Sequence, residues 1–429
     1  MTLFRQQKID IATLFILLAC SACGDRVEQS SSTKKRTSSP PLVFGILSQP
    51  FYEDEYDDSN KRNPDDRGYN RTYIAASYVK WLEDGGARSI PIPFDASPSL
   101  VEDILDQVDG VLFPGGASAL PSSAIAIWEV LHGEKYYFPE KDDAPRDMIP
   151  LWGTCLGMEF IIQLAADATE NDCGYRCNQD ILEKGYDSTN ISLPLLGVNR
   201  SGLYRPDSVY DIVTGFNVTM NNHHLGISPE RFRNNSGLSQ RFDVTSINYD
   251  LNGKAFVSTI EPSNRHVAEF ASSSSSKLVA PPVYGVQYHP EKNTHEYGFY
   301  PRSSIPYESI DHSPEGIDFS LYEARFLVNL ARENIENRGG DFGQNVQGIG
   351  KYNKPDLYPM IYTYPRKVGY KFEERYIIPL VSHWKREINV KKNDDSYHQV
   401  EDRGENLVTR KGHESRSMLR RKSQDPLEE

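Results

Sequence analysis

The chain contains 429 residues, of which 38% are hydrophobic and 25% charged, so it can form a sizeable core in one α/β domain with tails or in several domains. Its formal net charge of -13 at pH 7 argues against nucleic acid as a partner, because binding a phosphate backbone requires a basic surface. The acidic balance fits a soluble protein of an acidic or extracellular compartment.

The N-terminal segment has the layout of a secretory signal. Two basic residues precede an apolar run at 11–19, and small residues follow it. This run is too short to span a bilayer, so we expect residues 1–22 to be a cleaved signal peptide rather than a membrane span. Residues 23–40 then form a polar linker. A bacterial lipoprotein cleavage box at 17–20, "LLAC", is the less favoured interpretation.

Five Asn-x-Ser/Thr triplets support the secretory route. A single triplet is weak evidence, but five in a chain that begins with a signal predict N-glycans on the surface. Their acceptor residues are Asn70, Asn190, Asn199, Asn217 and Asn234.

Three of the five cysteines lie in the body of the chain, beyond the expected signal and linker: Cys155, Cys173 and Cys177. Cys173 and Cys177 are close enough in sequence to pair in an oxidising compartment. This part of the chain holds no Cys-x-x-Cys pair or histidine cluster with zinc spacing, so we predict no metal site. Cys155 is then the odd thiol.

Strand and helix patterns alternate from residue 42 onward. Buried-type strands are expected at 42–47, 89–94, 110–113 and 148–152. Helices are expected at 72–87, at 97–108, around 125–131 and directly after residue 155. Such alternation predicts βαβ units and a mostly parallel sheet with helices on both faces. The later part of the chain is less regular, with a strand at 283–288 and an amphipathic helix at about 319–335.

Beyond residue 339 the regular pattern fades. Two pieces rich in Tyr and Ile, at 358–365 and 376–384, precede a run of mixed charge. We expect residues 339–429 to be a C-terminal extension that is partly disordered, with the Tyr- and Ile-containing pieces able to pack on the core.

Gly153-Thr-Cys155-Leu-Gly157 is a thiol version of the nucleophile elbow Gly-x-Ser-x-Gly. Glycines permit the sharp strand-to-helix turn, which projects the central side chain above the sheet. The helix N-terminus beneath the thiol is expected to lower its pKa. The alternative is a cysteine that merely packs in the core.

Ligand sites in parallel sheets lie at the carboxyl ends of the strands. Gly115 and Gly116 follow the strand at 110–113, and Cys155 follows the next one. The backbone N–H of Leu156 is a candidate donor to a substrate oxyanion, and Gly115 or Gly116 is a candidate second donor.

His289 directly follows the strand at 283–288, and Glu291 lies two residues further on. An imidazole can take the proton of a thiol, while a carboxylate on its far nitrogen fixes the tautomer and stabilises the imidazolium. A lone histidine at a strand end is more often a surface residue, but a cysteine elbow earlier in the chain favours the catalytic interpretation.

Three motifs, "PLWGTCLGMEF", "LFPGG" and "GVQYHPEKN", together resemble those of the gamma-glutamyl hydrolases, relatives of the class I glutamine amidotransferases. "YIAASYVKWLEDGGAR" and "MNNHHLGIS" match as well. The resemblance runs over about 41–337 in the family's order, which places a catalytic domain at 41–338. The extension after it has no recognised counterpart.

The resemblance implies a flavodoxin-like α/β sandwich, commonly a homodimer, from lysosomes, vacuoles or the extracellular space. Cys155 would be the nucleophile and His289 its base. Glu291 matches the amidotransferase triad carboxylate, and His223 matches a family histidine at the rim of the active site.

The function implied is an omega peptidase, a cysteine hydrolase that cuts gamma-glutamyl bonds, with folylpoly-gamma-glutamates as small-molecule substrates and no cofactor. A glutaminase domain is the alternative enzyme, but it needs a synthase partner to receive ammonia. A non-catalytic scaffold that binds gamma-glutamyl ligands is the third interpretation.

Overall fold

The computed structural model describes residues 42–51, 71–132, 149–166, 180–200, 202–263, 282–300, 302–337, 355, 358–368 and 372–381. The expected signal and linker, Asn70, and the cysteines Cys173 and Cys177 lie outside these residues.

A seven-stranded sheet in the order β4-β1-β5-β6-β11-β10-β9 forms the centre of the molecule. The first five strands in that order pair in parallel, and the last two pair antiparallel. Their bounds are β4 (Ala87–Ile92), β1 (Leu42–Leu47), β5 (Gly110–Phe113), β6 (Leu151–Thr154), β11 (Val283–Val286), β10 (Ala255–Pro262) and β9 (Phe242–Tyr249). Strands β1, β5 and β6 are buried at every residue, as expected for parallel strands covered on both faces.

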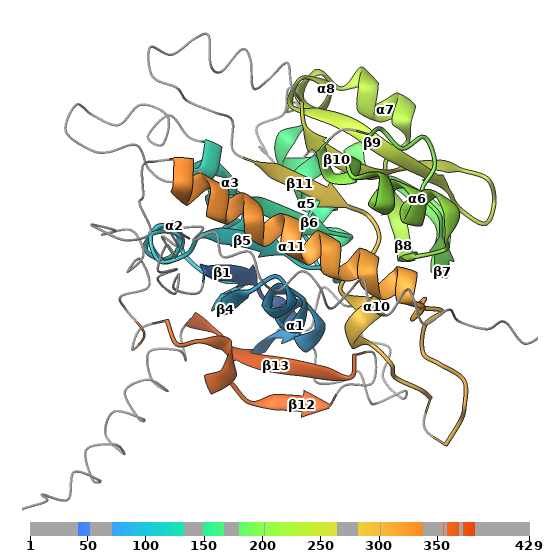
Figure 1. Cartoon of the computed structure of the whole chain (residues 1–429). Helices are drawn as coiled ribbons and strands as arrows, with labels where there is room; N and C mark the ends of the chain where they lie inside the picture. The colour runs from blue at the N-terminus through green and yellow to red at the C-terminus, as the bar shows by residue number, and fades with distance from the viewer. Residues whose placement is uncertain are drawn as a thin grey trace, which may run out of the picture.

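Helices cover both faces of this sheet. In Figure 1, α11 (Pro314–Asn337) crosses in front of the sheet with α1 (Ala76–Asp84) beside it, and α5 (Leu156–Ala165) lies behind. The indole N–H of Trp81 donates to the Ser320 carbonyl at 2.9 Å and so fixes α1 against α11. Helices α2 (Pro98–Leu105) and α3 (Ser122–His132) pack together, and α3 also contacts α5. The predicted fold class, a mostly parallel sheet with helices on both faces, is confirmed.

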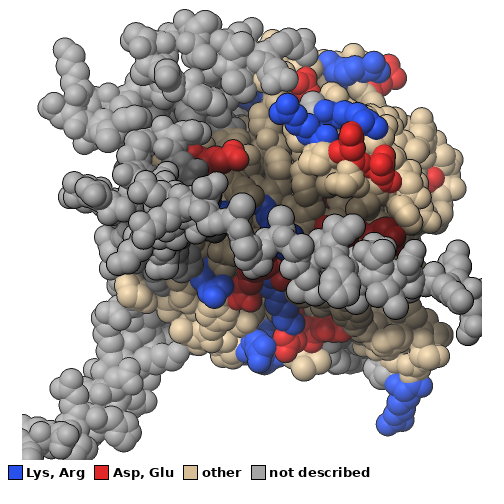
Figure 2. Space-filling view, viewed as in Figure 1, with Lys and Arg blue, Asp and Glu red and all other residues tan. Residues whose placement is uncertain are grey.

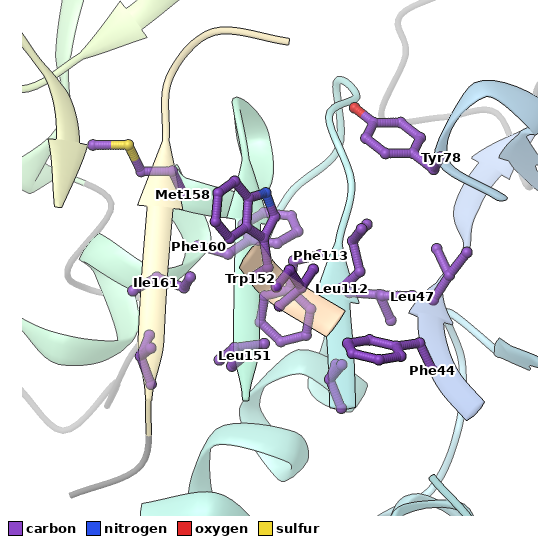
Figure 3. Close-up of a cluster of buried hydrophobic side chains, with 14 of the residues drawn as sticks. Phe44, Leu47, Tyr78, Leu112, Phe113, Leu151, Trp152, Met158, Phe160 and Ile161 are labelled. Carbon is purple, nitrogen blue, oxygen red and sulfur yellow. The ribbon is translucent and has the colours of Figure 1, made fainter. Parts of the chain in front are cut away.

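Large aromatic side chains fill the core on both sides of the sheet (Figure 3). The rings of Trp81 and Trp152 lie 5.6 Å apart, and those of Phe113 and Phe160 lie 6.5 Å apart. Each of these four side chains is fully buried. Truncating one of them to alanine would cost about 3–5 kcal/mol of stability. The ring of Tyr78 extends from the border of this cluster, with its hydroxyl turned away from the apolar residues (Figure 3).

The helix expected at 72–87 begins later than the pattern suggests. Residues Arg71–Ala75 form strand β3, which pairs with β2 (Gln49–Phe51) on one side and β13 (Glu374–Pro379) on the other. The helical spacing of the apolar residues favours a helix here. The backbone of this segment instead forms hydrogen bonds with two neighbouring strands, and local propensity does not depend on such distant partners. The helix itself ends at Asp84, with Gly85 as its C-cap.

The C-terminal extension completes a second, antiparallel sheet in the order β12-β13-β3-β2, with β12 at Arg366–Val368. Its Tyr- and Ile-containing pieces pack on the core, as expected from their composition. The residues among them that belong to the core cluster are Tyr358, Ile361, Tyr364, Tyr376 and Ile378.

The remaining elements flank the central sheet. Strands β7 (Glu183–Leu193) and β8 (Thr219–Gly226) form an antiparallel pair. The other helices among the described residues are η5 (Gly202–Tyr204), α6 (Asp207–Gly215), α7 (Pro229–Asn234), α8 (Ser236–Arg241), α10 (Lys292–His295) and η6 (Ile361–Thr363).

Among the residues with described positions, no helix combines the length and apolar character needed to cross a bilayer. On the face shown in Figure 2, the described acidic and basic side chains are intermixed, and no broad basic patch is visible there.

Candidate active site

Cys155 lies at the corner between β6 and α5. Its backbone has φ 52° and ψ -110°, a conformation that costs a residue other than glycine about 1–3 kcal/mol. The flanking glycines are required by packing, because a Cβ on Gly157 would collide with the Phe113 carbonyl, and one on Gly153 would lie 2.6 Å from Gly157. Such strain at a tight strand-to-helix turn is the geometry of a nucleophile elbow.

The environment of the thiol differs from the expectation. Cys155 is a free cysteine and only 5% exposed. Burial raises the pKa of the Cys155 thiol well above its usual range, the nearby Glu159 adds to this, and the Lys292 cation and the Leu156 N–H only partly oppose it. The Leu156 N–H at the helix N-terminus does lower this pKa, but desolvation outweighs it, so the predicted net lowering of the thiol pKa is wrong. A group that removes the proton is needed for the sulfur to react.

His289 and Glu291 form a buried pair after β11. The His289 Nδ1 atom lies 2.8 Å from Glu291 Oε1, and the two side chains are 7% and 1% exposed. The carboxylate accepts a hydrogen bond from the Nδ1–H group, which leaves Nε2 as the basic nitrogen. A Cβ placed on Gly115 would lie 2.6 Å from His289 Cε1 and 3.4 Å from Cys155 Cβ. The thiol and the imidazole therefore meet beside Gly115, where only a glycine fits.

Tyr78, from α1, also belongs to this group, and no feature of the sequence had indicated it. Its hydroxyl oxygen accepts a hydrogen bond from the Gly115 N–H at 2.8 Å and lies 3.3 Å from His289 Nδ1. The Gly115 N–H is therefore already engaged. Within the described parts of the chain, the Gly116 N–H has no recorded acceptor, so Gly116 and Leu156 are the better pair of oxyanion donors.

Cys155, His289, Gly115 and Gly116 all line one cavity of about 490 Å³. This volume is within the usual range for small-molecule sites. The cavity is also lined by five tyrosine and phenylalanine residues, Tyr73, Tyr78, Tyr300, Tyr307 and Phe372, and by five polar residues, Gln49, Asn222, His224, Lys292 and Glu308.

The two adjacent histidines of β8 point to opposite sides, as alternating strand residues do. His224 lines the cavity, whereas His223 does not. His223 is 5% exposed, its Nδ1 lies 2.7 Å from the Leu225 carbonyl, and its ring packs edge-to-face on Phe256. Burial lowers the pKa of His223 to about 4, so this ring is neutral near pH 7. The structure thus places His224 at the cavity, whereas the family resemblance indicated its neighbour His223.

A buried ion pair at the cavity wall was missed by sequence reasoning. Lys292 Nζ lies 2.6 Å from both Glu308 carboxylate oxygens, and Asn222 donates to Glu308 Oε1 at 2.8 Å. Burial alone would lower the pKa of Lys292, but the Glu308 and Glu291 carboxylates outweigh burial and raise it. The position of Lys292 directly after Glu291 could have indicated that it belongs to the site. No sequence pattern around Glu308 indicates a role at the site. In the described residues there is no group of three or more side chains suited to hold a metal ion.

A cysteine at a strained strand-to-helix corner, beside a buried His–Glu pair on a mostly parallel sheet, defines a class I glutamine amidotransferase-like hydrolase. The family model for Peptidase C26 matches residues 56–169. The chain is 30% identical over 328 residues to the human gamma-glutamyl hydrolase, covering 75% of this chain and 87% of that protein. It therefore belongs to the gamma-glutamyl hydrolase family, Peptidase C26.

Two further relatives are similar to the chain at a comparable level of identity. Gamma-glutamyl hydrolase B of Dictyostelium discoideum is 28% identical over 363 residues, which cover 83% of this chain and 87% of that protein. Gamma-glutamyl hydrolase 1 of Arabidopsis thaliana is 30% identical over 362 residues, which cover 82% and 87% respectively.

Proposed function

We propose that this protein is an omega peptidase that hydrolyses gamma-glutamyl bonds of folylpoly-gamma-glutamates through a Cys155 acyl-enzyme. The observation that carries the proposal is the meeting of the Cys155 elbow and the His289–Glu291 pair beside Gly115 in one cavity. The names of the relatives support the type of bond that is cut.

The proposed reaction begins with a neutral thiol, because burial disfavours the thiolate. As the sulfur attacks the gamma-carbonyl carbon, its proton passes to His289 Nε2, and Glu291 stabilises the imidazolium that forms. The Leu156 and Gly116 N–H groups donate to the oxyanion.

Collapse of this intermediate breaks the C–N bond, and His289 returns the proton to the leaving amine. A water molecule, deprotonated by His289, then attacks the thioester and releases the gamma-glutamyl acid with the free thiol. Every proton is handled by the Cys–His–Glu group, so the mechanism uses neither a metal nor an organic cofactor.

We assign substrate binding to the cavity wall. His224 directly lines the cavity, and His223 supports the same strand from the buried side. The glutaminase alternative uses the same three catalytic residues, so the choice of substrate decides between the two enzymes.

The cellular setting follows from the sequence and is part of the proposal. We place the protein in the secretory pathway, in lysosomes, vacuoles or the extracellular space, as a homodimer. The four predicted glycan acceptors among the described residues are all exposed, namely Asn190, Asn199, Asn217 and Asn234. Loss of apparent mass on treatment with an N-glycosidase and a dimer mass by light scattering would support this setting, and no mass shift would contradict the glycans.

The proposal is tested by incubating the full chain with pteroyl-tri-gamma-glutamate and, separately, with free glutamine, and resolving the products by chromatography. We expect shortened pteroylglutamates and no ammonia from glutamine. Ammonia release without cleavage of the pteroyl substrate would favour the glutaminase alternative. Binding of the substrate without any product would favour the scaffold.

A further inference from the structure

The C-terminal extension borders the proposed active site through strand pairing. Strand β13 pairs with β3, so that Arg375 lies opposite Ala75 and Ile377 lies opposite Tyr73. Strand β3 leads directly into α1, which carries Tyr78. A segment more than two hundred residues after the elbow therefore lies next to the cavity.

The start of β13 is fixed on two sides. The Arg375 guanidinium is buried and lies 4.3 Å from the ring centroid of Phe51 and 5.7 Å from that of Tyr73. On the other side, the Glu373 carboxylate accepts the Tyr297 N–H at 2.8 Å, and the Glu373 N–H donates to Glu296 at 2.9 Å. These contacts join the extension both to β2–β3 and to the loop after α10.

Phe372 is held beside these anchors and lines the cavity. Its ring centroid lies 5.8 Å from that of Tyr73. Tyr300 and Tyr307 line the same cavity, and their rings lie 4.9 Å apart. Tyr300 is 42% exposed, whereas Cys155 and His289 are 5% and 6% exposed. The aromatic residues therefore extend to the outer part of the cavity wall, and the reacting groups lie at the inner end of the cavity.

We propose that Phe372, supplied by the C-terminal extension, is a specificity-determining residue that binds a planar aromatic group of the substrate remote from the scissile bond. With Tyr73 it offers a surface of two rings, and aromatic groups bind such surfaces more strongly than their buried area alone explains. Binding energy from this remote group favours aromatic gamma-glutamyl conjugates over plain gamma-glutamyl peptides. The inference rests on the proposed function, and it adds a source of selectivity that this chain's own extension provides.

The test compares two substrates with the same scissile bond, p-aminobenzoyl-tri-gamma-glutamate and tri-gamma-glutamate. Phe372→Leu removes the ring and keeps an apolar side chain. We expect the ratio of kcat/KM for the aromatic over the plain substrate to fall roughly 5- to 20-fold, mainly through KM. Val368→Ala is the matched control, because Val368 belongs to the same extension but is 81% exposed on β12. An unchanged ratio in Phe372→Leu, or an equal fall in the control, would overturn the inference.

A binding measurement separates this inference from the catalytic proposal. Calorimetry with p-aminobenzoyl-glutamate measures the aromatic contact without turnover. We expect weaker binding to Phe372→Leu than to the wild type and the Val368→Ala control. Equal binding by all three proteins would overturn the role of Phe372. Failure of the wild type to cleave either substrate, with this binding difference intact, would instead count against the hydrolase alone. Thermal denaturation of each variant shows whether the fold is retained.

Discussion

The hydroxyl oxygen of Tyr78 accepts the Gly115 N–H at 2.8 Å and at the same time lies 3.3 Å from His289 Nδ1. One phenol on α1 therefore ties the glycine turn after β5 to the histidine after β11. The Gly115 amide is used to hold the turn, so the next amide, that of Gly116 in the cavity wall, is the candidate donor to a substrate.

Tyr78→Phe is expected to weaken both the turn and catalysis. It leaves the Gly115 N–H without its acceptor in a buried place, which costs about 1–3 kcal/mol in the free energy of unfolding. Turnover is expected to fall roughly tenfold, because His289 loses a neighbour that fixes its ring. Urea unfolding and steady-state kinetics measure the two effects. Tyr249→Phe, at a side chain that is 47% exposed, is the control. Normal stability and turnover in Tyr78→Phe would contradict this role.

The buried thiol predicts a particular pH dependence of alkylation. Because burial raises the pKa of Cys155 above its usual range, the free enzyme carries a thiol at pH 6–9. The rate of inactivation by iodoacetamide should therefore rise about tenfold per pH unit over this window without reaching a plateau. A plateau below pH 7 would mean that Cys155 and His289 already form an ion pair, and that the thiol is not neutral.

Glu159, one turn into α5, predicts a stability effect with a defined sign. Burial raises the pKa of its carboxyl from 4.5 to about 7, although Gln287 donates to it at 3.1 Å. The unfolded chain loses this proton as the pH rises from 4.5 to 7 while the folded protein retains it, so folding becomes less favourable across that window. Glu159→Gln should raise the free energy of unfolding by about 1–3 kcal/mol at pH 8 and change it little at pH 4.

Chemical denaturation at both pH values measures this difference, and Glu129→Gln on the exposed side of α3 is the control. An equal effect of Glu159→Gln at pH 4 and pH 8 would show that titration of this carboxyl is not the cause.

The histidines of β8 are expected to separate by role. His224→Asn changes a lining residue of the cavity, so KM should rise several-fold while iodoacetamide still alkylates Cys155. His223→Asn removes a buried ring that packs on Phe256 and lies close to the Leu225 carbonyl, so the melting temperature should fall. A rise in KM for His223→Asn alone, at normal stability, would instead support the direct substrate contact that the family resemblance implies for His223.

The sequence predicted those features that depend on short spacing. Glycines on both sides of Cys155 require a tight turn, and His289 with Glu291 two residues later forms a pair that one loop can hold. The alternation of strands and helices likewise predicted the parallel sheet. Each strand, helix and motif in these patterns is specified by residues that lie close together in the sequence.

Contacts between distant segments were not predictable in this way. Thr72 lies opposite Ile378, 306 residues further along the chain, in the β3–β13 pairing, and this pairing turns the start of an expected helix into β3. The Tyr78–Gly115 bond joins a helix to a loop after a different strand. Desolvation of Cys155 depends on all the residues that pack around the thiol, and no local sequence pattern predicts it.

The proposed acyl-enzyme at Cys155 is tested most directly by mass spectrometry of the acid-quenched enzyme after rapid mixing with pteroyl-tri-gamma-glutamate. The wild type should gain the mass of the acyl group on the peptide that contains Cys155, and His289→Ala should form this adduct far more slowly. Cys155→Ala should form none and should turn over the substrate roughly 10³-fold more slowly or worse. An adduct on another residue, or activity of Cys155→Ala within tenfold of the wild type, would contradict the account.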